Sequence, residues 1–231
     1  MERQTDRVHV RKLDVVDTIR WSWAVLTDRL ELVGLTFAVG LLSVVALLGI
    51  SRPVPSEPPE IDGWVWPVYL AFFLAVALVW GVVYLTANRA VEERPAPLGD
   101  RLVSAATRLP ALLMTAALMW LVSAIGLVLF VLPGIYLFHR LVLAYPACVI
   151  DRKGPLGSLK AGWRASRGSV LKVFVVSVVY FALVAGSNAV ANAFGEYTLA
   201  GGFVSAGLSA AVIPLFGLAF GHLYLESSRN Q

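Results

Sequence analysis

The sequence predicts an all-α integral membrane protein with six transmembrane helices. Hydrophobic residues make up 58% of its 231 residues and charged residues 15%, and the mean hydropathy is +0.75. Soluble domains are typically ~45–50% apolar and ~25% charged. Uncharged runs long enough to cross ~30 Å of hydrocarbon recur along the chain, and they lack the alternation typical of strands. Helices are expected because each helix pairs its own backbone groups within lipid.

We expect residues 1–231 to form a single polytopic membrane domain that begins with a polar cytoplasmic tail at 1–12. No cleavable signal peptide is visible, so the first span is expected to direct insertion. The six spans are predicted at 32–50, 66–87, 110–131, 134–149, 173–192 and 199–224.

The distribution of basic residues predicts the orientation of these spans. Nearly all Lys and Arg lie in 1–31, 88–109, 150–172 and 225–231, on one side of the membrane, whereas the other side holds only Arg52. Cytoplasmic loops of membrane proteins carry this excess of positive charge. Both termini are therefore expected in the cytoplasm.

Pro133-Gly134 is predicted to form a tight outer hairpin between the third and fourth spans. The stretch 110–149 would make a helix of about 60 Å, which is enough for two crossings. A single crossing would move the basic segment 150–172 to the outside and break the charge bias.

Amphipathic segments at 13–30, 98–109 and 155–168 precede the first, third and fifth spans. "PLGDRLVSAATRLPALL" (97–113) aligns with "PLGSLKAGWRASRGSVL" (155–171) without a gap, which indicates an internal repeat. The predicted architecture is thus three helical hairpins, each preceded by a cytoplasmic amphipathic interfacial helix.

The third amphipathic segment supplies candidate contacts to lipid. Leu156, Leu159 and Trp163 share one face at helical spacing. Such a helix lies in the headgroup plane with its cations near anionic lipid. It either binds lipid or a peripheral partner, or it only anchors the topology. The candidate contacts to lipid are Lys160, Trp163, Arg164 and Arg167.

Residues 132–168, "LPGIYLFHRLVLAYPACVIDRKGPLGSLKAGWRASRG", resemble a pattern in prokaryotic six-span proteins. These are related to the YciC-like proteins and to the membrane domain of some glycerophosphoryl diester phosphodiesterases. The resemblance implies a six-span protein of the prokaryotic cytoplasmic membrane, in a family of mostly unknown function. The phosphodiesterase barrel is a separate soluble domain for which this chain has no room, so that activity is not carried over. Gly162 stands where the family usually has serine.

Arg140 is the candidate centre of a polar cluster. It is expected about 9 Å inside the outer end of its span, where a charge costs ~2–3 kcal/mol and should face protein, water or the interface. The predicted cluster is Arg140, His139, Asn188, Asn192 and Glu196, because 188, 192 and 196 share a helical face. It would bind an anionic group such as a lipid phosphate, line a transport path, or join two spans. Alternatively, Arg140 snorkels outward.

The last span is rich in small residues and is expected to be central in the bundle. Gly217 and Gly221 are expected to pack within the chain rather than in a dimer, and Pro214 to kink the helix. Trp80 and Trp120 are expected to lie deeper in the membrane and to be packing residues.

The chain carries no motif that favours catalysis: GxxxxGK[ST], HExxH and GxSxG are absent. The single Cys148 excludes a disulfide within the chain, and His139 and His222 lie too far apart in depth to share a metal ion. We expect a non-catalytic accessory protein or lipid-interacting scaffold without cofactors. Its expected partners are anionic membrane lipids, with a membrane-protein partner or homo-oligomer also open, and no nucleic acid. The alternatives are a small transporter or channel using Arg140 to bind an anionic group, and a lipid-modifying enzyme.

Overall fold

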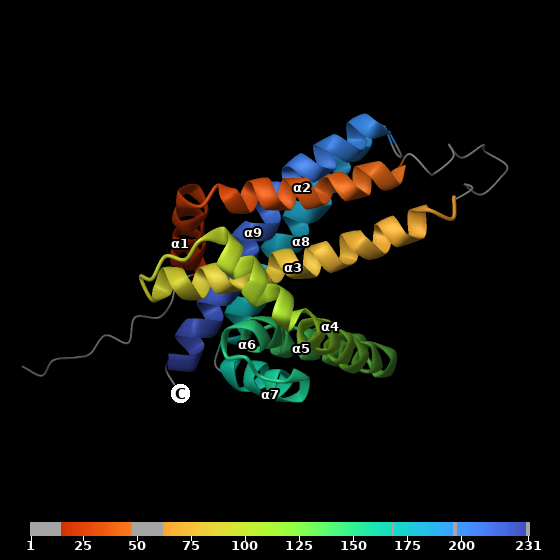
Figure 1. Ribbon diagram of the computed structural model, residues 1–231. Coiled ribbons are helices and arrows are strands. Elements are labelled where there is room, and N and C mark those ends of the chain that lie inside the picture. The colour runs from red at the N-terminus through yellow and green to blue at the C-terminus, as the bar shows by residue number, and fades with distance from the viewer. Residues whose placement is uncertain (1–14, 48–61, 168, 196–197, 230–231) are drawn as a thin grey trace, which may run out of the picture.

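The computed structural model describes residues 15–47, 62–167, 169–195 and 198–229, and the regular elements in these ranges are all helices (Figure 1). They are α1 (Val15–Asp28), α2 (Glu31–Ala46), α3 (Val65–Val91), α4 (Leu98–Leu129), α5 (Val131–Leu141), α6 (Ala144–Ile150), α7 (Pro155–Ala165), α8 (Val170–Ala193) and α9 (Leu199–Arg229).

The helices agree with a multi-pass membrane protein. By length and composition, five stretches can cross a membrane: α3, α4, α8, α9, and α5 with α6 as one stretch. The pair α1 and α2, bent by 84° at Arg29-Leu30, is a possible sixth span. Large apolar side chains such as those of Val128 and Leu132 lie exposed on the outside of these helices. The predicted all-helical membrane fold is confirmed at this level, and its division into three hairpins remains a prediction.

Four hydroxyl groups buried within the helix bundle are satisfied locally. Thr36, Thr86, Thr115 and Ser177 each donate a hydrogen bond to the backbone carbonyl one turn earlier in the same helix. Such bonds allow a hydroxyl to sit in an apolar environment without a partner on another helix.

The prediction of a separate interfacial helix at 98–109 is wrong, because α4 runs without a break from Leu98 to Leu129 with Pro110 inside it. At 1.5 Å per residue this helix is about 48 Å long. A proline can be tolerated inside a membrane helix that packs against neighbouring helices. Here Ala105 and Leu112, on either side of Pro110, are both buried.

The turn between the third and fourth spans lies three residues before the predicted one. Phe130 is the extended residue that separates α4 from α5 (φ −159°, ψ 136°), and Pro133 stands in the first turn of α5, where a proline costs no hydrogen bond. Gly134 serves close packing: a Cβ there would lie 2.5 Å from the backbone nitrogen of Leu127. Pro133 and Gly134 therefore follow the turn and do not form it.

The predicted span 134–149 is two helices, with Val142 and Leu143 forming a turn between α5 and α6. Pro146 explains the break. Its ring would clash with the carbonyl of Val142 in a continuous helix, and it has no N–H to donate. In the third position of α6 the same proline is tolerated.

Helix α9 is central, as predicted. It contacts α1, α2, α3, α6, α7 and α8 and runs through the middle of the assembly (Figure 1). It continues as one helix across Pro214. A Cβ at Gly217 would meet Val83 and Trp80 of α3, and one at Gly221 would meet Ala87 of the same helix. These glycines serve packing within the chain.

Candidate functional site

Arg140 lies where α5 meets α7, in a group of four residues that we call the Arg140 junction: Tyr136, Arg140, Trp163 and Ser166. Its Nε donates to the Tyr136 hydroxyl at 2.9 Å. Its Nη1 donates to Ser166 Oγ at 3.2 Å and to the Trp163 carbonyl at 3.4 Å. The guanidinium carbon is 4.6 Å from the Trp163 ring centroid and 5.5 Å from that of Tyr136. Hydrogen bonds and cation–π contacts thus tie α7 to α5.

The sequence brings α7 to Arg140 through small residues. The buried face of α7 consists of Ser158, Ala161, Gly162 and Ala165. Gly162 approaches the backbone of Ala144, at the start of α6, so closely that a Cβ would lie 2.5 Å from the Ala144 nitrogen. Helix α7 therefore folds back along α6 (Figure 1), and its last turn reaches Arg140.

The other members of the predicted polar cluster lie elsewhere. Asn188 and Asn192 are exposed, and they follow the start of α8 by about 27–33 Å of helix. His139 is buried, with Nδ1 2.7 Å from the Ile135 carbonyl and its ring 5.0 Å from that of Phe174. Glu196 lies outside the described residues. Helical spacing within α8 does not show that α7 folds back and supplies the partners of Arg140.

The candidate contacts to lipid divide into two groups. Lys160, Arg164 and Arg167 are exposed, whereas Trp163 is half-buried in the Arg140 junction. Leu156, assigned to the apolar face, is also exposed. The large apolar residues predicted to anchor α7 therefore do not form its buried face, and lipid contact by the three cations remains a prediction.

Replacing Arg140 by Met should lower stability by about 1–3 kcal/mol, since the hydrogen bonds from its charged group to α7 are lost. Arg140→Lys should recover only part of this loss, because an ammonium group cannot reproduce the planar fork. Thermal unfolding in detergent would measure both variants. Arg164→Met is the matched control: the hydrogen bond of this exposed arginine, to the Lys160 carbonyl, stays within α7, and its loss should change stability by less than about 0.5 kcal/mol. Equal melting temperatures for the Arg140 and Arg164 variants would contradict this structural role.

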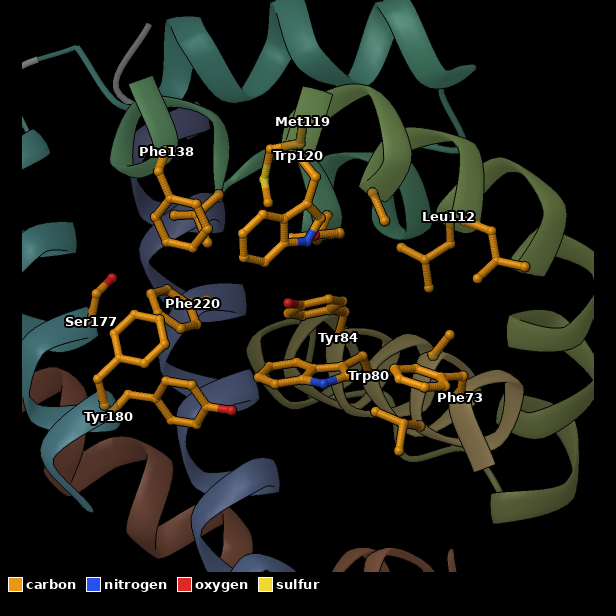
Figure 2. Close-up of a pocket in the computed structure, with 17 residues that line it drawn as sticks. Phe73, Trp80, Tyr84, Leu112, Met119, Trp120, Phe138, Ser177, Tyr180 and Phe220 are labelled. Atoms are coloured by element: carbon orange, nitrogen blue, oxygen red, sulfur yellow. The ribbon is translucent and has the colours of Figure 1, made fainter. Parts of the chain in front are cut away.

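A second candidate site is a cavity of about 390 Å³ within the helix bundle, which we call the aromatic pocket (Figure 2). Six helices and the turn between α5 and α6 line it. The lining residues are Phe73, Val76, Ala77, Trp80, Tyr84, Leu112, Leu113, Ala116, Met119, Trp120, Phe138, Val142, Tyr145, Ser177, Tyr180, Phe181 and Phe220.

The pocket has a buried floor and an apolar mouth. Tyr84, Met119 and Phe220 on the floor are buried. At the mouth, Phe73 is 66% exposed and Trp120 is 57% exposed. These two residues belong to helices that can span a membrane, so the mouth opens on the side of the bundle where lipid would lie.

Aromatic rings dominate the wall and pack against one another. The Trp80 ring centroid is 5.7 Å from that of Tyr84 and 6.3 Å from that of Tyr180. Across the pocket, Trp120 is 5.6 Å from Phe138. Offset and edge-to-face pairs at these separations are favourable. All seventeen lining residues are uncharged.

The sequence did not predict this pocket. Trp80 and Trp120 were expected to be packing residues, yet Trp120 stands at an open mouth and Trp80 lines the cavity. The available signal was the occurrence of Trp or Tyr in the same half of several spans, as with Tyr84 and Tyr180. Aromatic residues of that kind are common in membrane helices, so the signal does not distinguish a cavity from a filled core.

Arg101 forms a second polar feature, and it is 3% exposed. It donates to Thr86 Oγ1 at 2.6 Å and to the Ala96 carbonyl at 3.2 Å, and it forms an ion pair with Glu31. The guanidinium group thus connects α2, α3 and α4. Its donors are engaged by protein groups, which indicates a structural role.

Among the described residues, no group of three or more His, Cys, Asp and Glu lies together where it could hold a metal ion. Comparisons of the chain with protein-family models, with curated proteins and with solved structures found no match.

Proposed function

We propose that this protein is a non-catalytic integral membrane protein, a lipid-interacting scaffold that takes an apolar molecule from the bilayer into the aromatic pocket. The observation that carries the proposal is the cavity of about 390 Å³ with exposed apolar side chains at its mouth. Ligand pockets in proteins are typically ~300–1,000 Å³ and mostly apolar.

The mouth supports an occupant that comes from the membrane. Phe73, Trp120 and Phe181 surround it, and all three lie on helices that can span a bilayer. A polar solute would have to cross hydrocarbon to reach it. Liquid water is a poor occupant, because filling the cavity would take about a dozen molecules at ~30 Å³ each, and each needs two to four polar partners.

We further propose that the chain lies in the cytoplasmic membrane of a prokaryote with both termini inside. The one-sided distribution of Lys and Arg in the sequence supports this orientation, and the resemblance of residues 132–168 to six-span prokaryotic proteins supports the compartment. On this topology the exposed Lys160, Arg164 and Arg167 of the α7 region contact anionic headgroups.

The surroundings of Arg140 support the scaffold rather than the transporter alternative. Tyr136, Trp163 and Ser166 already surround its guanidinium group and bond to it. An anion-binding arginine in a transport path would direct these donors towards an open cavity, and Arg140 is absent from the lining of the aromatic pocket.

The proposal is tested by filling the pocket. Ala116 lines it, and Trp in its place should occupy most of the space near the mouth. The chain would be extracted with its surrounding lipid and the co-purifying apolar molecules measured by mass spectrometry. We expect Ala116→Trp to reduce at least one enriched species about fivefold or more.

Val128→Trp is the control, since Val128 is exposed on the same helix and does not line the pocket. Ala116→Leu fills less space, and it provides a second test of the pocket in case the larger Trp variant does not fold. If no molecule is enriched over the bulk membrane, or if enrichment is the same in the Ala116 variants and the control, the pocket does not bind a molecule from the bilayer.

A further inference from the structure

We propose that the occupant of the aromatic pocket is a neutral molecule with a flat ring bearing carbonyl oxygens and an apolar tail, the chemistry of a membrane quinone. This inference rests on the proposed function and adds the class of ligand. It follows from the hydroxyl groups, the absence of charge, the aromatic surfaces and the depth of the pocket.

Two tyrosine hydroxyls supply hydrogen-bond donors to the cavity. Figure 2 shows the hydroxyls of Tyr84 and Tyr180 pointing from different helices into the same space. Tyr84 is 2% exposed. Within the described part of the chain, neither hydroxyl forms a hydrogen bond. A hydroxyl that faces an apolar cavity without a partner is costly, so an occupant with acceptor oxygens is favoured over one made only of hydrocarbon.

The absence of charge from the lining excludes a charged headgroup. None of the seventeen residues around the pocket is Asp, Glu, Lys, Arg or His. A phosphate or carboxylate in this position would lose its hydration without gaining a counter-ion. Neutral carbonyl oxygens need only the hydroxyl donors that are present.

The walls suit a flat ring. Trp80, Tyr84 and Tyr180 present aromatic surfaces, and Trp120 and Phe138 add two more. Aromatic rings pack favourably in offset and edge-to-face geometry. An apolar cavity of about 150 Å³ already admits one benzene ring, and the aromatic pocket, at about 390 Å³, has more than twice this volume. It accommodates a substituted ring or a two-ring system together with the start of a tail.

The depth of the hydroxyls separates this ligand from an ordinary phospholipid. Tyr84 precedes the end of α3 at Val91 by seven residues, and Tyr180 follows the start of α8 at Val170 by ten. These separations correspond to about 10 and 15 Å of helix. The polar part of a phospholipid stays in the interfacial region outside the hydrocarbon. A neutral ring with a long apolar tail can enter the hydrocarbon completely.

The test uses the full chain in detergent. Decyl-benzoquinone would be titrated while tryptophan fluorescence is recorded, because Trp80 and Trp120 line the pocket and a bound quinone quenches them. Decylbenzene has the same tail and a ring without carbonyl oxygens, and it would be used as a competitor. We expect saturable quenching by the quinone and at least tenfold weaker binding of decylbenzene.

The Tyr84→Phe/Tyr180→Phe double variant should bind the quinone about tenfold or more weakly, since two hydrogen bonds are lost. Tyr69→Phe is the matched control, because Tyr69 also lies on α3 but not in the pocket lining. Its affinity should be unchanged.

The outcomes separate this inference from the proposed function. Equal affinity for quinone and decylbenzene, without an effect of the double variant, would overturn the quinone assignment and leave a pocket for apolar molecules. Failure of both compounds to bind, together with unchanged lipid content in Ala116→Trp, would overturn both. Linear, unsaturable quenching would show partition into the micelle and would also count against the quinone.

Discussion

Valine in place of Gly162 is expected to separate α7 from α6 and to lower the stability of the folded chain by about 3 kcal/mol or more. A Cβ at this position would lie 2.5 Å from the nitrogen and 2.9 Å from the Cα of Ala144. Both are backbone atoms, so no flexible side chain can move aside. Separation of the two helices would also remove Trp163 and Ser166 from Arg140.

The single cysteine provides the measurement for this variant. Cys148 is fully buried in α6, so its reaction with a maleimide reports opening of the contact between α6 and α7. We expect Gly162→Val to react at least tenfold faster than the original chain. Gly157→Val is the control, because a Cβ at Gly157 of α7 would meet only Lys153, at 3.6 Å. Equally slow labelling and equal melting temperatures for the two variants would refute the described packing of α7.

Alanine in place of Glu31 is expected to cost about 2–3 kcal/mol, because it leaves the Arg101 charge buried without its counter-ion. The hydrogen bonds from Arg101 to Thr86 and to the Ala96 carbonyl remain, but they do not neutralise the charge. The partial exposure of Glu31 keeps the expected loss below that of a fully buried pair.

A double replacement separates charge burial from packing. Glu31→Leu combined with Arg101→Met removes both charges and should recover much of the loss seen with Glu31→Ala, because well-packed apolar residues often replace a buried ion pair at little cost. Glu92→Ala is the control: it breaks an exposed ion pair with Arg89, which should contribute less than about 1 kcal/mol. Thermal unfolding in detergent would compare the four chains. If Glu31→Ala and Glu92→Ala melt alike, the ion pair to Arg101 contributes nothing beyond a surface contact.

Much of the helical layout is predictable because lipid restricts the choices. Long uncharged runs predicted the helices that are long enough to cross a membrane. The small residues of α9 correctly predicted its central position and the packing of Gly217 and Gly221 within the chain. The positions of the turns were harder to predict from the sequence. Pro133 and Gly134 indicated a nearby turn. They did not fix its position, because proline is also common in the first turn of a helix. The break before Pro146 could have been predicted, because a proline disrupts the helical turn that precedes it.

The partners of Arg140 could not be found from spacing alone. Residues on one helix have calculable faces and depths, but a contact between helices depends on where a connecting segment folds. Gly162 decides this point, since it allows α7 to lie directly on α6 and so brings Ser166 to Arg140. A single glycine in an amphipathic segment does not by itself predict such a contact. The aromatic pocket is even harder to predict from the sequence, because a cavity forms where side chains from several helices leave space unfilled.

The sideways opening of the aromatic pocket has a consequence for how occupancy depends on conditions. A molecule that enters past Phe73 and Trp120 arrives by diffusion in two dimensions, within one leaflet. Occupancy then follows the mole fraction of that molecule among its neighbouring lipids, and its total concentration in the sample is irrelevant. Extra detergent micelles would empty the site by dilution, and enrichment of the host leaflet would refill it.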